Sequence, residues 1–177
     1  MFELEKSLDN EKYIKFIEFA LNTSDFFMLV YCKKKHEGFK RSMKTIKRGL
    51  SDLKVMSQFR FSWADTIMSP YCGFEYQVCF YRSDSSALHH LLSAKSLFEW
   101  DWPLLPQDLC FYRMSHCWFY SVSHERMAIV TAPTQQDITF FKQLDIISNE
   151  KSYSIEKWSI EEKWLTDYLA SANRCNQ

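Results

Sequence analysis

Apolar and polar side chains alternate along this chain with two periods, one typical of helices and one typical of strands. Apolar residues recur at helical spacing between positions 10 and 21 and again between 40 and 53. The continuous apolar run at 26–32 has the length of a strand and predicts that both of its faces are buried. Alternation with a period of two predicts strands at 55–63 and 74–82, which we expect to pair as a hairpin with a long connection.

Turn and capping residues delimit the elements in the second half of the chain. Asp84 begins a third helix, and the prolines and tryptophans of residues 97–107 predict a loop. A tight hairpin is expected from strands at 109–113 and 117–123, followed by a strand at 126–131. Two capping patterns open the last two helices, Thr134 with Asp137 and Ser159 with Glu162, and residues 173–177 are expected to fray.

The order of these elements predicts an α+β fold. Strands that follow one another through short connections favour a mostly antiparallel sheet with helices packed on it. The strand at 26–32, the helix at 40–53 and the strand at 55–63 also allow one parallel β-α-β crossover. Because no repeat, low-complexity tract or linker interrupts the sequence, we expect residues 1–177 to form a single domain.

Composition excludes several classes of protein. Hydrophobic residues make up 46% of the chain and aromatic residues 17%, which is incompatible with disorder. With three glycines, the chain has neither a Walker loop nor a dinucleotide-binding fingerprint, so we expect no cofactor. The charged start of the chain and the lack of a run of about 18 apolar residues predict a cytoplasmic protein without a membrane segment.

Four potential metal ligands lie close together in the sequence, at Cys110, His116, Cys117 and His124. Zinc sites generally use a close pair of cysteines on a knuckle, and this segment has no Cys-x-x-Cys. In the expected hairpin, Cys110 and Cys117 point to opposite faces of the sheet. We therefore expect no metal site, and packed, reduced thiols instead.

One group of residues has the chemistry for catalysis. His124 and Glu125 stand at the end of a strand, where a histidine can act as a general base, and Asp108 is expected nearby. Arg113 would hold an anionic substrate. A histidine in this place more commonly bonds a turn. A small hydrolase or transferase built on these residues is therefore the alternative hypothesis for function.

The net charge is zero, but the charges are separated along the chain. Residues 33–54 hold nine Lys or Arg against Glu37 and Asp52, and the remainder is correspondingly acidic. The polar face of the helix at 40–53 is predicted to expose four cations, Arg41, Lys44, Lys47 and Arg48. Because no nucleic-acid-binding motif is visible, this separation favours a protein partner over nucleic acid, and a solvated helix face is the other interpretation.

We refer to residues 97–107 as the aromatic–proline loop. The loop combines rigid prolines with tryptophans and carboxylates, a composition typical of recognition surfaces. Its candidate partner-binding residues are Glu99, Trp100, Asp101 and Trp102. If the loop binds a partner, one of these tryptophans should be exposed, and its carboxylates should form an acidic patch with Asp108. A lid with buried tryptophans that seals the edge of the sheet is an equally good interpretation.

Two consecutive segments carry a resemblance to a known family. The run Trp100-x-Trp-Pro-x-x-Pro-x-Asp-Leu-x-Phe-x-Arg113, followed by Cys117-Trp118-x-x-Ser121-x-x-His124-Glu125, resembles a family of small bacterial cytosolic proteins from Bacillus-like organisms. No activity is established for that family, so the resemblance implies an origin and a fold rather than a mechanism. Gln107 stands where the family pattern has an acidic residue, which weakens a paired-carboxylate site with Asp108.

These features together favour one function over the hydrolase alternative. Charge separation, the aromatic–proline loop and the lack of a catalytic motif in the sequence predict a non-enzymatic protein-interaction module. A regulatory or toxin-immunity protein of a bacterial cytoplasm would fit this description.

Overall fold

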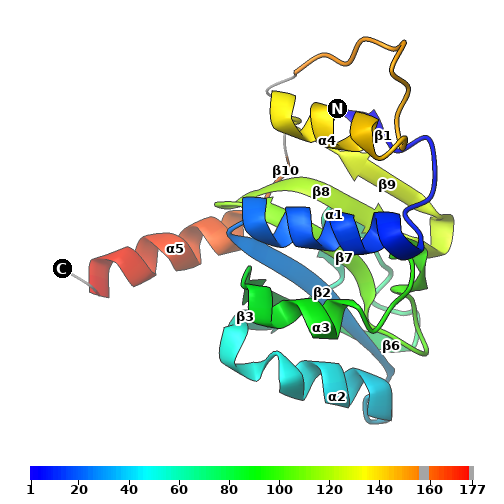
Figure 1. Ribbon diagram of the computed structural model, residues 1–177. Helices are drawn as coiled ribbons and strands as arrows, with labels where there is room; N and C mark the ends of the chain where they lie inside the picture. Colours follow the sequence, from blue (N-terminus) through cyan, green and yellow to red (C-terminus); the bar gives the residue numbers. More distant parts are fainter. Residues whose placement is uncertain (156–159, 176–177) are drawn as a thin grey trace.

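The computed structural model describes residues 1–155 and 160–175, which form an α+β fold around one large sheet (Figure 1). The strands are β1 (Phe2–Glu3), β2 (Phe26–Lys34), β3 (Lys54–Phe59), β4 (Ser62–Trp63), β5 (Thr66–Ile67), β6 (Phe74–Arg82), β7 (Gln107–Arg113), β8 (His116–Val122), β9 (Met127–Val130) and β10 (Ile160–Glu161). The α-helices are α1 (Asn10–Thr23), α2 (Arg41–Gly49), α3 (Leu88–Leu91), α4 (Gln135–Gln143) and α5 (Lys163–Cys175). The order in the sheet is β1-β9-β8-β7-β2-β6-β3 with β10 beside β8, while β4 and β5 form a separate hairpin.

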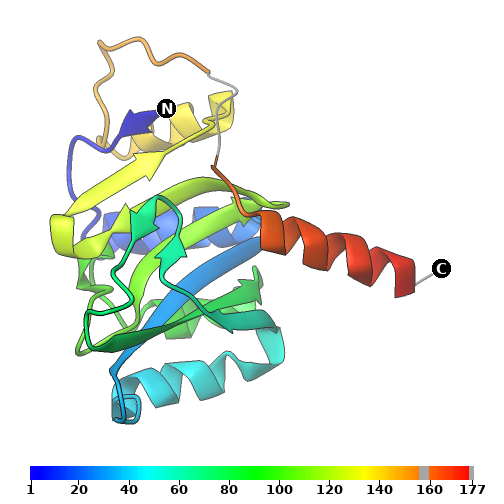
Figure 2. The same cartoon turned by 180° about the vertical axis from the view of Figure 1, so that it is seen from behind.

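The sheet carries an apolar layer on each face. Helices α1, α2, α3 and α4 cover one face, where the larger cluster of buried side chains lies (Figure 1). Seen from behind, the β4–β5 hairpin lies over the opposite face, and α5 begins against that face and then projects away from the body (Figure 2). We call these the helix face and the hairpin face.

The central strand β2 confirms the prediction of a strand that is buried on both sides. Phe27, Leu29 and Tyr31 belong to the core of the helix face, whereas Met28 and Val30 belong to the core of the hairpin face. All five side chains are fully buried. Full burial of side chains of this size stabilises the fold by roughly 1.5–3 kcal/mol each. The strand therefore contributes to both cores at once.

The parallel crossover that the sequence allows is absent from the described strands, whose pairs are all antiparallel. β2 and β3, which α2 connects, both pair with β6, and β6 lies between them. The strand expected at 55–63 is also interrupted. β3 ends at Phe59, and the chain leaves β6 after Arg60 to form the β4–β5 hairpin. As a result, β3 is the last strand on its side of the sheet.

The predicted capping signals at Asp84 and Thr134 are confirmed, whereas Asp9, which precedes α1, makes no side-chain capping hydrogen bond. Asp84 accepts a hydrogen bond from the backbone N–H of Ser86 at 2.8 Å, and Thr134 with Asp137 forms a capping box at the start of α4. Ser159 lies outside the described residues, and its predicted cap therefore stays a prediction.

Helix ends are less well predicted. The helix expected at 40–53 ends at Gly49, and a 3-10 turn follows at 51–53. Helix α5 continues to Cys175, through part of the segment that was expected to fray, and residues 176–177 lie outside the described part. None of the described helices has the length and apolar character needed to cross a membrane.

A β-bulge in β8 overturns the predicted orientation of two cysteines. Trp118 and Phe119 both point to the helix face opposite the single residue Phe111, so β8 contains one extra residue there. This insertion places Cys110 and Cys117 on the same face, the hairpin face, rather than on opposite faces. Burial raises the pKa of the Cys110 thiol, and the neighbouring Cys117 thiol adds to the shift. Within residues 1–155 and 160–175, no group of three or more His, Cys, Asp or Glu is placed to hold a metal ion.

Candidate functional site

Asp108, a predicted catalytic residue, serves as an internal anchor. Its side chain is almost fully buried at the start of β7, on the hairpin face. One carboxylate oxygen accepts a hydrogen bond from the indole Nε1 of Trp63 at 2.9 Å, and the other accepts from the backbone N–H of Ser123 at 3.0 Å. The backbone of Asp108 has a φ of 54°, a left-handed conformation that aspartate tolerates better than most residues. The residue therefore fastens the β4–β5 hairpin to the sheet.

The other predicted catalytic residues do not join Asp108 in one cleft. His124 and Glu125 are exposed in a 3-10 turn after β8, with His124 Nε2 3.6 Å from Glu125 Oε1. Arg113 lies at the far end of β7 and points to the helix face, where its guanidinium is 4.2 Å from the ring of Trp118. Asp108 and Arg113 are five positions apart on one strand, so their side chains leave opposite faces of the sheet. The geometry does not support a hydrolase or transferase site built from these four residues.

The titration of Asp108 gives a first testable prediction. Burial raises the pKa of its carboxyl above the ordinary value, so between these two pKa values the folded protein binds more protons than the unfolded chain. Its contribution to stability is therefore present at low pH and is lost as pH rises through the folded-state pKa. We expect the difference in free energy of unfolding between wild type and Asp108→Asn to be larger at about pH 4 than at about pH 7. A difference that is constant across this range in denaturant titrations would contradict the prediction.

The aromatic–proline loop buries Trp100 and leaves Trp102 partly exposed. Trp100 is fully buried, and its indole Nε1 donates to the hydroxyl of Tyr13 at 2.6 Å. The expectation that Trp100 is available to a partner is therefore wrong. Trp102 is half-buried and packs edge-to-face against Phe74, with the ring centroids 5.3 Å apart. The predicted acidic patch is also incomplete, because Asp108 is buried.

The loop and α2 enclose a groove of about 670 Å³, which we call the loop groove. Ser42, in the first turn of α2, donates a hydrogen bond from its hydroxyl to the carbonyl of Leu104 in the loop. The side chain of Leu104 is 73% exposed. The residues that line it include Ser42, Phe98, Glu99, Asp101, Trp102 and Leu104. The aromatic–proline loop and α2, which the sequence analysis predicted separately as partner-binding segments, thus meet at this groove.

The cations of α2 have two different roles. Arg41, Lys44 and Arg48 are exposed, as the helical pattern predicted. Lys47 is only partly exposed, which corrects the prediction. Its Nζ lies 4.4 Å from the ring centroid of Phe39 and bonds Gln77, and burial lowers its pKa. Because Lys47 sits between the helix and the sheet, only the other three cations form the open basic face.

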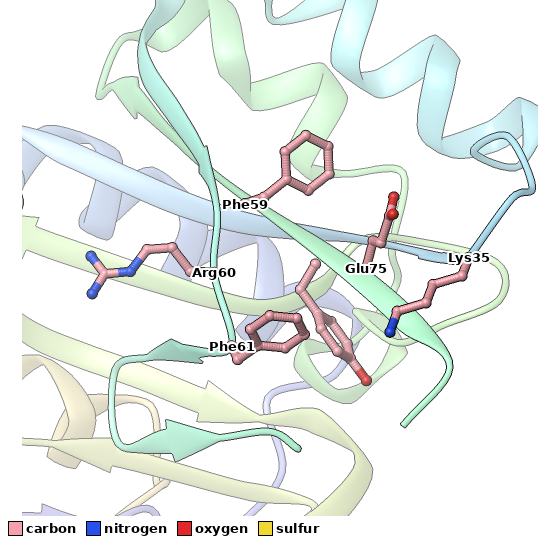
Figure 3. A pocket seen from close by; sticks show the side chains of 6 residues that line it. Lys35, Phe59, Arg60, Phe61 and Glu75 are labelled. Atoms are coloured by element: carbon pink, nitrogen blue, oxygen red, sulfur yellow. The ribbon is translucent and has the colours of Figure 1, made fainter. Parts of the chain in front are cut away.

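A second cavity, of about 250 Å³, lies where the chain leaves β3 (Figure 3). We call it the edge pocket. Its walls are aromatic and its rim is charged, and its lining residues are Lys35, Phe59, Arg60, Phe61, Glu75 and Tyr76. The sequence placed Phe59 and Phe61 in a strand, but period-two alternation gives no sign that this strand lies at the edge of the sheet. Sequence reasoning therefore missed this pocket.

Comparisons with protein-family models, with curated proteins and with solved structures give no significant match to this chain. The resemblance to small bacterial cytosolic proteins consequently stays a prediction. What the protein does is inferred from the geometry of its surfaces.

Proposed function

We propose that the protein is a non-enzymatic protein-interaction module, of the regulatory or toxin-immunity type, which binds a partner protein at the loop groove. The observation that carries the proposal is the meeting of the aromatic–proline loop with α2. The loop supplies apolar anchors, Leu104 and the accessible part of Trp102, at the mouth of the groove. Exposed apolar side chains gathered in a concave surface are typical of interaction sites.

Charge supports a protein as the ligand of this groove. Glu99 and Asp101 belong to the loop wall, and Arg41 and Lys44 are exposed cations of α2, the helix that supplies Ser42 to the groove. A surface with both signs of charge around an apolar centre orients a partner that has the complementary arrangement. The carboxylates would repel the phosphates of a nucleic acid, so nucleic acid remains the less favoured ligand. A bacterial cytoplasm as the setting rests on the resemblance of residues 100–125.

A charge placed in the loop groove is expected to abolish partner binding. In Leu104→Glu, an exposed apolar anchor becomes a carboxylate beside Glu99 and Asp101, so both the apolar contact and the charge balance are lost. We expect the fraction of protein that co-purifies with a stoichiometric partner to fall by at least about tenfold. The measurement is native mass spectrometry of the protein purified gently from its source organism.

Ile14→Glu is the matched control, because Ile14 is an exposed apolar residue on α1, away from the groove. This variant should keep the partner. A partner that Leu104→Glu retains at the wild-type level would show that the loop groove is not the binding site. If wild type brings down no partner even after mild crosslinking before lysis, the interaction proposal itself fails.

A further inference from the structure

The outer edge of β3 is open. Among the described residues, β3 pairs only with β6, so no strand covers its other side. The backbone N–H of Arg60 donates to the carbonyl of Tyr76 at 3.0 Å, which fixes the phase of the ladder. By the alternation of antiparallel pairing, the N–H groups of Ser57 and Phe59 then point outward. Such an edge is a template for the backbone of an added strand.

The edge has little of the protection that sheet edges commonly have. Five uncharged residues, 55–59, separate Lys54 from Arg60, and there is no proline among them. A bulge between Lys54 and Met56 distorts only the first part of the strand. The last residues of β3, Ser57 to Phe59, carry no charge and follow the bulge, so they can accept a partner strand.

Exposed apolar side chains gather at the end of this edge. Phe59 is 61% exposed and forms one wall of the edge pocket opposite Phe61 (Figure 3). Ile67, 86% exposed, lies close to Phe61, because its neighbour Met68 donates a backbone hydrogen bond to the Phe61 carbonyl at 2.7 Å. Tyr71, which is 92% exposed, follows Pro70, whose carbonyl accepts a hydrogen bond from Lys35 of the pocket lining at 3.1 Å. An apolar cluster of this kind on a surface marks a contact site.

The charge around the edge is positive. Glu75, the one carboxylate of the pocket lining, is held by Lys33, with Nζ and Oε2 2.5 Å apart. Lys35, Lys54 and Arg60 form no salt bridge within the described part of the chain. The guanidinium of Arg60 instead lies 4.4 Å from the ring of Trp164. The exposed cations of α2 precede β3 in the chain and add to the same sign of charge.

We propose that β3 and the edge pocket bind an extended, acidic segment of a partner protein, which adds to the sheet as a further strand. An aromatic or large aliphatic side chain of the segment fills the edge pocket, and its carboxylates face Lys35, Lys54 and Arg60. This surface is distinct from the loop groove, so the inference goes beyond the proposed function.

A second copy of this chain fits the edge less well. If two β3 strands paired antiparallel about a twofold axis, Lys54 of one copy would approach Arg60 of the other. The basic helices α2 of both copies would also be brought toward each other. Like charges across an interface disfavour association. Charge therefore selects an acidic strand over a self-pairing one.

Selection from a library tests this proposal without a known partner. Immobilised wild-type protein is presented with random 12-residue peptides displayed on phage, and selected peptides are synthesised with a fluorescent label. We expect enrichment of sequences that combine one aromatic residue with several Asp or Glu. Their affinity, measured by fluorescence anisotropy, should fall about tenfold or more in Phe59→Ala and several-fold in Lys54→Glu. N-methylation of alternate peptide amides should weaken binding to a similar extent, because it removes main-chain donors.

The controls separate this surface from the rest of the molecule. Phe59 is exposed, so Phe59→Ala should melt within a few degrees of wild type, which circular dichroism checks. Ile14→Ala removes an exposed apolar side chain from α1 and should leave peptide affinity unchanged, as should the groove variant Leu104→Glu. Loss of peptide binding and loss of the groove partner can thus be told apart.

Several outcomes would overturn the proposal. These are a selection with no enrichment over protein-free beads, peptides that bind Phe59→Ala as tightly as wild type, and N-methylated peptides that keep full affinity. A wild-type dimer that Phe59→Ala dissociates in sedimentation experiments would show that a second copy occupies the edge instead.

Discussion

An Asp108→Ala variant is expected to lose about 3 kcal/mol of the free energy of unfolding. Two donors in the interior, the indole N–H of Trp63 and the backbone N–H of Ser123, would lose their acceptor. A buried donor without a partner costs roughly 1–3 kcal/mol. Alanine is also less suited than aspartate to a φ of 54°. Denaturant unfolding followed by tryptophan fluorescence measures the change.

The Asp108→Asn variant separates the contributions of the two hydrogen bonds to this loss in free energy of unfolding. In Asp108→Asn, one side-chain oxygen still accepts from Ser123, but the amide nitrogen faces the indole N–H of Trp63, so about half of the loss should remain. Asp101→Ala is the control, since that carboxylate is more accessible and, within the described part of the chain, accepts a single 3.3 Å bond from Gln107. If Asp108→Ala and Asp101→Ala destabilise equally, the anchoring role of Asp108 is refuted.

Removing the guanidinium of Arg113 should have an effect of similar size. Asp137 is fully buried, and both of its oxygens receive hydrogen bonds from Arg113, at 2.8 and 2.7 Å. The same guanidinium donates to the carbonyl of Thr23 at 3.1 Å, so it ties α1 and α4 to β7. In Arg113→Met, a buried carboxylate loses its countercharge, and we expect the free energy of unfolding to fall by about 3 kcal/mol or more.

A second substitution identifies the cause of this loss. Arg113→Met combined with Asp137→Asn removes the unpaired charge and should recover about 1 kcal/mol relative to Arg113→Met alone. Arg82→Met is the matched control, because Arg82 is exposed and makes one 3.4 Å bond to a backbone carbonyl. Were the double variant no more stable than Arg113→Met, the stranded charge would not be the reason for the loss. Arg113 is therefore expected to act in stability rather than in substrate binding.

Hydrophobic periodicity was sufficient to predict the fold class and most elements. The run at 26–32 indicated a doubly buried strand because both faces of β2 meet apolar side chains, and such a strand tolerates no polar alternation. Asp84 and Thr134 located the starts of two helical segments because their capping hydrogen bonds reach only two or three residues along the chain. Local signals succeed where the interaction itself is local.

What failed depended on contacts between distant residues. One extra residue in β8 turned Cys117 to the side of Cys110, and no pattern in the hairpin announces a bulge. The composition of the aromatic–proline loop does not predict which tryptophan is buried. Trp100 is buried, and its indole N–H donates to the hydroxyl of Tyr13, 87 positions away. Likewise, β3 became an edge because β6 took the place between it and β2. The candidate site was thus predicted only in part, through the loop and the exposed cations of α2.

The β4–β5 hairpin and α5 are held by the same carboxylate. Glu162, just before α5, accepts from the backbone N–H of Ala64 in the hairpin turn at 3.0 Å and from the indole Nε1 of Trp164 at 2.5 Å. Release of the first turn of α5 would therefore remove the acceptor of the Ala64 N–H and weaken the hold on the hairpin, which Asp108 and Tyr120 also anchor through Trp63 and Asp65. In native-state hydrogen exchange, the two segments should open together as one cooperative unit, at a lower free energy than the strands beneath them. The hairpin face would then be uncovered transiently while the core of the helix face stays closed.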